Sequence, residues 1–224
     1  MCKLYLVPTP IGNLDDITIR ATQKLDEVDL ILAEDTRRTK ILLDRYKIQK
    51  KLSSYHAFNE HKVLDRIIGE LKLNKSIALV TDAGTPGISD PGFLLIRRCL
   101  EEQIEVECLP GPTAFVPALV ASGIPCDRFV FEGFLPAKKG RNKRLNELVE
   151  EKRTMIFYES PQRIPRTIVD LSNVFGRDRR ASLSRELTKI HEETIRGSLE
   201  ELAEFTGSKT LKGEIVLIVQ GKTS

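Results

Sequence analysis

Short apolar runs alternate with longer segments of helical periodicity along the chain, and this alternation constrains the fold more than any other feature. In the first half, the helical segments include one that starts at Thr18, the segment TRRTKILLDRY and the segment FLLIRRCLEE. They are separated by strand-like runs at 4–7, 28–33, 76–81 and 106–109. Strands that alternate with helices usually pair in parallel, because each helix carries the chain back across the sheet. The pattern predicts an α/β fold with a largely parallel sheet.

A second series of strands and helices follows the turn PGPT and an apolar helix expected over 114–121. Its strand-like runs are FVFEGF, TMIFYE, RASLS, EETIRG and GEIVLIV, and helical segments such as RNKRLNELVEE and RIPRTIVDL lie between them. A chain of 224 residues has room for two modest domains. We expect an N-terminal α/β domain over 1–114, which carries the loops described below, and a C-terminal α/β domain over 115–224.

The composition narrows the class of protein. With 41% hydrophobic residues and a mean hydropathy of -0.21, the chain has enough apolar material for packed cores. Its apolar runs are far shorter than the roughly 20 residues that cross a bilayer, so we expect no membrane span and no signal peptide. The net charge of +3 is too small to identify a nucleic-acid-binding protein by itself.

The cysteines give no sign of a metal site. They stand at Cys2, Cys99, Cys108 and Cys126, without a C-x-x-C pair and without a nearby histidine. We therefore expect reduced thiols, no metal and a cytoplasmic location.

Three loops rich in glycine and proline follow strand-like runs. They are PTPIGNLDD at 8–16, DAGTPGISDPG at 82–92 and PGPTA at 110–114. Any one of them is also explained as an ordinary turn, but the second loop holds three glycines, two prolines and two aspartates directly after an apolar strand. Open α/β sheets bind ligands beyond the carboxyl ends of their strands, so the three loops predict a small-molecule site. No G-x-G-x-x-G opens a helix after the first strand, and no G-x-x-x-x-G-K-[ST] occurs, which disfavours dinucleotide and P-loop nucleotide binding.

Six motifs occur in a recognisable order over nearly the whole chain: PTPIGNLDDIT, AEDTRRT, TDAGTPGISDPG, LPGPTA, FYESPQRI and SRELTKIHEE. Together they resemble the ribosomal RNA small subunit methyltransferase I family, a branch of the tetrapyrrole methylase superfamily. The resemblance implies a class III methyltransferase that uses S-adenosylmethionine, with two α/β domains, a cofactor cleft between them and a homodimeric state. It also implies 2′-O-methylation of a cytidine in the decoding region of 16S ribosomal RNA, either free or in the small ribosomal subunit.

The resemblance also implies which residues contact the cofactor, largely through backbone groups. Carried over motif by motif, they are Pro10, Ile11, Gly12, Ala83, Gly84, Thr85, Ile88, Thr113, Ala114, Tyr158, Glu159 and Leu187. The second loop departs from the tetrapyrrole enzymes, because AGTP stands where those enzymes carry a GDP-type signature. This departure favours the RNA branch of the superfamily.

Basic residues suited to RNA gather in FLPAKKGRNKR. Five cations occur within seven residues, and such a density attracts phosphate, although a solvated surface loop has the same composition. They are Lys138, Lys139, Arg141, Lys143 and Arg144. The family often carries a further C-terminal segment associated with RNA binding, whereas this chain ends shortly after GEIVLIVQG. We therefore expect RNA binding to depend on the dimer or on other loops.

Two further segments are candidates for RNA contact. AEDTRRT follows an apolar strand, so Arg37 is expected at the edge that carries the loops, while Asp35 or Thr36 is expected to cap the next helix. SSYHAFNEH offers aromatic and amide side chains for an unpaired base, with Tyr55 and Phe58 as equally good core residues and Asn59 as an alternative helix cap.

The catalytic candidates lie in SRELTK. A ribose hydroxyl is a weak nucleophile, so its methylation gains from a nearby base or from a cation that stabilises the developing alkoxide. Glu186 and Lys189, with Arg185 beside them, supply such groups. The same residues are equally consistent with a surface ion-pair cluster.

Two alternative functions remain open on the sequence. One is methylation of a tetrapyrrole or another small molecule, against which the basic loop and AGTP argue. The other is a non-catalytic RNA-binding or ribosome-binding protein, against which the intact glycine loops argue. A measurement of S-adenosylmethionine binding would separate a non-catalytic protein from a methyltransferase that acts on RNA or on a small molecule.

Overall fold

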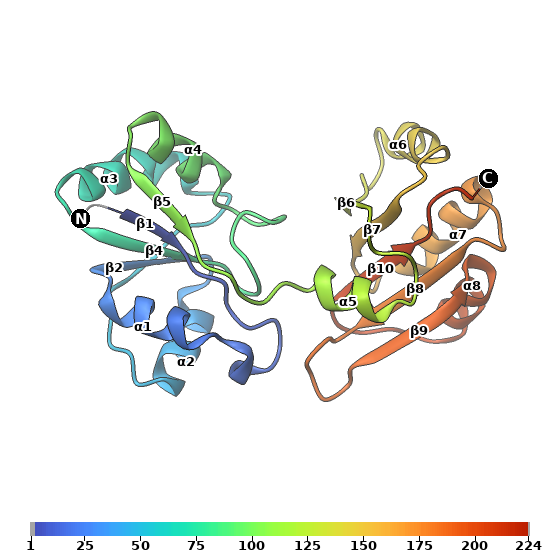
Figure 1. Ribbon diagram of the computed structural model, residues 1–224, viewed down its shortest axis with the longest axis horizontal. Coiled ribbons are helices and arrows are strands. Elements are labelled where there is room, and N and C mark those ends of the chain that lie inside the picture. Colours follow the sequence, from blue (N-terminus) through green and yellow to red (C-terminus); the bar gives the residue numbers. More distant parts are fainter. Residues whose placement is uncertain (1–2, 224) are drawn as a thin grey trace. The chain divides into compact units, whose positions relative to one another are not determined.

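The computed structural model describes residues 3–223, which form two compact units, 1–113 and 114–224. The division falls one residue before the expected boundary after residue 114. Each unit consists of one five-stranded sheet and its helices (Figure 1). No helix among the described residues is long and apolar enough to cross a membrane.

The sheet of the first unit is entirely parallel and has the strand order β3-β2-β4-β1-β5. Its strands are β1 (Lys3–Leu6), β2 (Leu30–Ala33), β3 (Leu52–Ser54), β4 (Ser76–Val80) and β5 (Glu105–Cys108). The connecting helices are η1 (Leu14–Asp16), α1 (Ile19–Glu27), α2 (Thr36–Arg45), α3 (Glu60–Lys72) and α4 (Phe93–Glu101). The parallel sheet expected from the alternating pattern is therefore present in this unit.

Helices cover both faces of the first sheet (Figure 1). One hydrophobic cluster packs α1 and α2 against one face through Leu25 and Leu42, and another packs α3 and α4 against the opposite face through Ile67 and Leu95. The chain leaves β1 for α1 and leaves the neighbouring β4 for α4. These two connections therefore depart to opposite faces, and such a point at the carboxyl edge of an open sheet is where ligands bind.

The sheet of the second unit is mixed and has the order β6-β7-β10-β8-β9, in which only β6 and β7 are parallel. Its strands are β6 (Phe129–Phe134), β7 (Thr154–Glu159), β8 (Arg180–Arg185), β9 (Glu193–Ser198) and β10 (Ile215–Val219). Its helices are α5 (Phe115–Ala121), α6 (Arg141–Leu148), α7 (Ile164–Phe175) and α8 (Leu199–Ser208). The largely parallel pairing thus ends with the first unit.

The two faces of the second sheet are covered differently. The large cluster on one face includes Leu145 of α6, Ile168 of α7 and Leu202 of α8. On the other face α5 is the one helix of the described residues that packs on the strands, through Ala118 and Leu119. This thinner face carries several of the expected cofactor residues.

Candidate functional site

The loops after β1 and β4 are joined by their backbones. Thr9 N donates to Gly84 O and Gly84 N donates to Thr9 O, both at 2.9 Å, which makes an isolated antiparallel bridge. The hydroxyl of Thr9 also donates to the carbonyl of the buried Thr81, at 3.0 Å, directly after β4. The first two glycine and proline loops therefore form one structure rather than two independent turns.

The loop after β5 joins the same structure. The hydroxyl of Thr85 donates to Pro112 O at 3.0 Å. A Cβ atom placed on Gly111 would lie 2.6 Å from Cβ of Pro8, so the first and third loops approach at a point where only glycine fits. The three loops predicted from the sequence to share a site do lie together.

Gly84 stands where the three loops meet. Its φ of +83° belongs to the left-handed region, and a Cβ on it would lie 3.6 Å from Ile11 Cγ2, 3.7 Å from Pro112 O and 4.0 Å from Thr113 Cα. The flanking N–H groups of Ala83 and Thr85 have no backbone partner among residues 3–223. Bare backbone with free amide donors suits a ligand that is held by main-chain groups, as the cofactor of this superfamily is expected to be.

The other expected cofactor residues of the first unit lie in the same loops. Pro10 and Ile11 are buried, whereas Gly12 and Ile88 are exposed. Ile88 N donates to Thr85 O at 3.3 Å and so closes the turn that follows Gly84.

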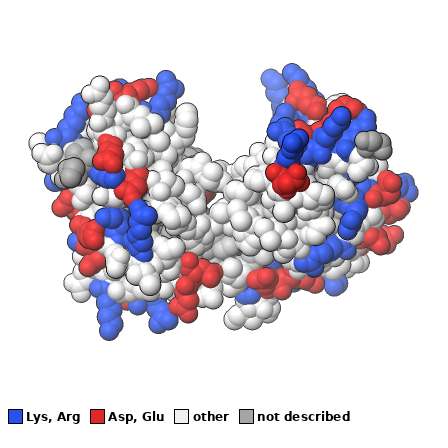
Figure 2. Space-filling view, in the orientation of Figure 1, with Lys and Arg blue, Asp and Glu red and all other residues white. Residues whose placement is uncertain are grey.

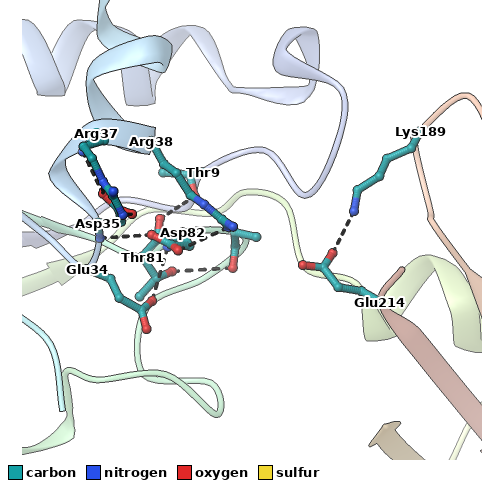
Figure 3. A network of polar contacts seen from close by, with 10 residues as sticks. Thr9, Glu34, Asp35, Arg37, Arg38, Thr81, Asp82, Lys189 and Glu214 are labelled. Atoms are coloured by element: carbon teal, nitrogen blue, oxygen red, sulfur yellow. Dashed lines mark hydrogen bonds and ion pairs between the residues drawn. The ribbon is translucent and has the colours of Figure 1, made fainter. Parts of the chain in front are cut away.

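A charged network lies at the carboxyl ends of β2 and β4 (Figure 3). The carboxylate of Asp82 accepts from Asp35 N at 3.0 Å and pairs with Arg38 at 3.2 Å. Glu34 accepts from Asp82 N at 3.4 Å. These bonds tie the start of α2 to the second glycine loop.

The backbone of Arg37 is bonded to Asp35 of this network, and the side chain of Arg37 is exposed to solvent. Asp35 caps α2 by accepting from Arg37 N, and its carboxylate pairs with the guanidinium of Arg37 at 2.6 Å. The hydrogen bonds from Arg37 hold the pKa of Asp35 well below its usual value. The expectation that Asp35 or Thr36 caps the helix is confirmed for Asp35. The Arg37 side chain is 89% exposed, so it is available to a phosphate at this edge.

Three of the expected cofactor residues of the second unit lie on the thinly covered sheet face. Ala114, Tyr158 and Leu187 pack against the cluster that includes Ala118 and Val216. The ring of Tyr158 meets Phe131 edge-on with centroids 5.1 Å apart. These three residues, far apart in sequence, are therefore brought together within the unit.

Glu159 differs from them because its side chain is committed to the interior. It is 3% exposed, and its carboxylate accepts from the hydroxyl of Thr167 at 2.8 Å and from Ser160 N at 2.8 Å, and pairs with Arg163 at 3.3 Å. Only the backbone of Glu159 is left for the expected cofactor contact.

Arg141 corrects one expectation about the basic loop. It is only 3% exposed, and its guanidinium donates to Asp170 at 2.8 Å, Thr167 at 2.9 Å and the carbonyl of Pro136 at 3.2 Å. A buried arginine with all three nitrogens bonded cannot also contact a phosphate. Arg141 anchors the loop to α7.

Three lysines of this segment are free instead, two in the loop before α6 and one, Lys143, within α6. Lys138, Lys139 and Lys143 are exposed and have no ion-pair partner within residues 3–223. Arg144 is not free, since two of its nitrogens bond the buried carboxylate of Glu132 at 2.8 and 2.9 Å and the third bonds Glu147 at 3.0 Å. Figure 2 shows lysine and arginine side chains gathered over α6 and the loop before it.

Glu186 and Lys189 form a pair just after β8. Lys189 Nζ lies 2.9 Å from Glu186 Oε1. It also lies 3.1 Å from Glu214 Oε2 (Figure 3). Glu186 has a φ of +52°, unusual for a residue with a side chain, and Glu214 N donates to its carboxylate. The backbone thus holds Glu186 in a conformation that its side-chain bonds stabilise.

The pair is ionised on both sides. The hydrogen bond from Lys189 lowers the pKa of Glu186 below its usual 4.5. Burial lowers the pKa of Lys189, but hydrogen bonds to Glu186 and Glu214 more than offset it, so that this pKa is raised above 10.5. Near neutral pH the site therefore presents an ammonium group rather than a free amine base.

Comparisons of this chain with known proteins all indicate the same protein family. Residues 3–203 match the sequence profile of tetrapyrrole (corrin/porphyrin) methylases. The chain is 48% identical to the ribosomal RNA small subunit methyltransferase I of Thermotoga maritima, over 99% of this chain and 100% of that protein. It is 49% identical to the protein of the same name from Escherichia coli O157:H7, over 98% of this chain and 78% of that one.

Solved structures give the same fold at low sequence identity. A diphthine synthase superposes with a TM-score of 0.76 and 13% identity, covering 99% of this chain and 90% of that one. A uroporphyrin-III C-methyltransferase from Thermus thermophilus, in complex with S-adenyl homocysteine, superposes with a TM-score of 0.67 and 17% identity, covering 96% of each chain.

Proposed function

The chain belongs to the ribosomal RNA small subunit methyltransferase I branch of the tetrapyrrole methylase family, and from this we propose that it transfers a methyl group from S-adenosylmethionine to RNA of the small ribosomal subunit. The acceptor that we propose is the 2′-hydroxyl of a cytidine in the decoding region of 16S ribosomal RNA. A homodimeric state, a cytoplasmic location and the expected cofactor cleft remain predictions.

The joining of the three glycine and proline loops carries the proposal. The Thr9–Gly84 bridge and the Thr85–Pro112 hydrogen bond fix bare backbone at the carboxyl edge of the first sheet. Such a rigid surface can hold a small ligand in one orientation without a loss of loop entropy on binding. The loops fit S-adenosylmethionine, whose bound form supplies a methyl group on a sulfonium that is ready for displacement.

The protein's main contribution to this reaction is alignment. A methyl transfer by displacement requires the acceptor oxygen, the methyl carbon and the leaving sulfur to lie in line, so fixed geometry lowers the barrier. In this chain, Gly84, Thr85 and Thr113 would hold the cofactor side. Arg37 and the lysines of the loop before α6 would hold the RNA side through its phosphates.

Glu186 and Lys189 are the proposed catalytic residues. Because both are ionised near neutral pH, their roles differ from those of a neutral acid or base. The Lys189 ammonium would stabilise negative charge that develops on the ribose oxygen, and the Glu186 carboxylate would orient Lys189 and accept the departing proton.

The proposal is tested with S-adenosylmethionine labelled in its methyl group and purified small ribosomal subunits from a strain that lacks this activity. We expect label in 16S RNA, at one 2′-O-methylated cytidine mapped by mass spectrometry of nuclease fragments. Label in an added uroporphyrinogen but not in RNA would instead favour the tetrapyrrole alternative. RNA binding without cofactor binding in calorimetry would favour a non-catalytic protein.

A further inference from the structure

One aromatic side chain of the first unit is exposed in a way that the core does not explain. Phe58 is 93% exposed, although its neighbour Tyr55 is fully buried among the residues of α3 and α4. Single exposed apolar side chains are common on protein surfaces, so what makes Phe58 a candidate for contact with a ligand is the loop that holds it and the residues beside it.

The loop that carries Phe58 is rigid. The amide side chain of Asn59 accepts from His56 N at 2.8 Å and donates to Ser54 O at 3.1 Å. Two backbone bonds, from Asn59 N and Glu60 N to His56 O, close the turn further. Asn59 thus stands at the start of α3 but its side chain fixes the loop instead of capping the helix. Phe58 lies at the tip of this turn.

His56 lies behind Phe58. The two rings meet edge-on, with centroids 6.0 Å apart and planes at 63°. His56 Nδ1 is buried and has no hydrogen-bond partner in the described part of the chain. Because that atom is buried, the contact that this arrangement offers to an unpaired nucleobase is stacking on the exposed ring of Phe58.

The position of this loop favours RNA as the occupant. Tyr55 N donates to Ala33 O at 2.8 Å, so the loop leaves the sheet beside the end of β2, where Asp35 and the exposed Arg37 begin α2. The aromatic surface and the cationic side chain therefore lie at the ends of neighbouring strands, on the sheet edge that carries the glycine loops. Cations for the backbone beside a ring for the base are what a single strand requires.

We propose that Phe58, backed by His56, is a stacking platform for one unpaired base of the RNA substrate. The proposal rests on the function proposed above and adds a base contact that is independent of phosphate. Stacking releases no condensed counterions, so this contact should differ from the lysine contacts in its response to salt.

The chain contains no tryptophan, which allows a direct test. Phe58→Trp places a single fluorophore at the proposed platform, and Leu73→Trp places one at a residue that is 74% exposed at the C-terminal end of α3. We expect a single-stranded oligoribonucleotide from the decoding region to quench Phe58→Trp strongly and Leu73→Trp little. The same oligoribonucleotide in a duplex should quench both little.

Affinity measurements complete the test. Phe58→Ala should weaken binding of the single strand by between about 5-fold and about 150-fold, without a change in the salt dependence or in the S-adenosylmethionine affinity. Leu73→Ala should leave all three unchanged. Equal quenching at both positions, or wild-type affinity of Phe58→Ala, would overturn the platform while methylation by the wild-type chain still supports the proposed function.

A protein contact at Phe58 gives a different result. If Phe58→Ala changes the mass of the protein in sedimentation without RNA, the ring serves an interface between chains and the platform is wrong. If the wild-type chain methylates no RNA of the small subunit, the proposed function itself fails, whatever Phe58 does.

Discussion

Gly84 and Gly87 have almost the same positive φ, +83° and +85°, but they face different surroundings. A Cβ on Gly84 would face Ile11, Pro112 and Thr113, where the three loops meet. A Cβ on Gly87 would meet only the end of Ile96, at 3.6 Å. The two glycines therefore separate the cost of a strained backbone from the cost of lost ligand space.

Gly84→Ala and Gly87→Ala should be equally strained, each losing about 1 kcal/mol of unfolding free energy because an alanine resists the left-handed region. Only Gly84→Ala should lose affinity for S-adenosylmethionine, by about tenfold or more, since its methyl group enters the proposed ligand space. Calorimetric titration measures the affinity and urea unfolding measures the stability. Equal affinities for the two variants would move the cofactor away from this loop.

Lys189→Ala should lower the single-turnover rate of methyl transfer by about a hundredfold with little change in cofactor or RNA affinity, because the ammonium acts on charge that develops during the reaction. Lys212→Ala removes an exposed lysine close to Glu214 in sequence and serves as the control. If Lys189→Ala keeps the wild-type rate at saturating substrates, Lys189 has no catalytic role, and the alignment of the acceptor oxygen with the methyl group accounts for the rate.

The single-turnover rate should be flat from about pH 6 to about pH 9. The pKa of Glu186 is lowered, so its carboxylate is charged over the whole of this pH range. The pKa of Lys189 is raised, so its ammonium group also keeps its charge over the whole range. The stability that Glu186 contributes is present above its unfolded pKa and is lost as the pH falls through its lowered folded value. A rate that climbs steadily with pH across this range would instead mean that neutral Lys189 acts as a base.

Substitution of Lys138, Lys139 and Lys143 together by alanine should weaken RNA binding and flatten its salt dependence. Each lost phosphate contact with a single strand removes about 0.7 from the log–log slope, because fewer counterions are released. The matched triple variant replaces Lys47, Lys50 and Lys51 of the first unit. Fluorescence anisotropy over a range of salt concentrations gives both slopes, and equal slopes would indicate a general effect of charge.

Arg141→Met should destabilise the protein by roughly 3 kcal/mol, because it strands the polar groups of Asp170 and Thr167 that now bond the guanidinium. Arg166→Met removes an exposed cation that also pairs with Asp170, at 3.7 Å, and should cost less than about 0.5 kcal/mol. Urea unfolding followed by circular dichroism measures both. If the two variants lose similar amounts of unfolding free energy, the buried contacts of Arg141 do not stabilise the protein more than an exposed ion pair does.

The sequence predicted the loops of the first unit and every strand of its sheet except β3, and it did so for a physical reason. Alternating strands and helices force a parallel sheet, and a parallel sheet brings the carboxyl ends of its strands to one edge. The meeting of the loops after β1, β4 and β5 therefore follows from the order of the elements. The capping by Asp35 follows as well, because a short acidic side chain directly before a helix satisfies its first N–H groups.

Other features depend on packing that the sequence pattern does not encode. Arg141 lies in a run of exposed cations, and only α7, which brings Asp170 and Thr167 beside it, makes it a core residue. The antiparallel pairs of the second sheet likewise depend on how β8 and β10 meet. One element was readable but missed: α8 begins with the capping box of Ser198 and Glu201 directly after a strand.

The strand order of the first unit also bears on how the chain is made. Lys3 in β1 pairs with Ser76 and with Glu105, so the first strand of this unit has both of its partners far downstream in the sequence. Pairing over such separations is slow, because a long segment must be ordered before any contact is gained. The hydrogen bond from Thr85 to Pro112 comes later still. The first two loops can therefore join once Gly84 has emerged, whereas the third joins them only when almost all of the first unit is present.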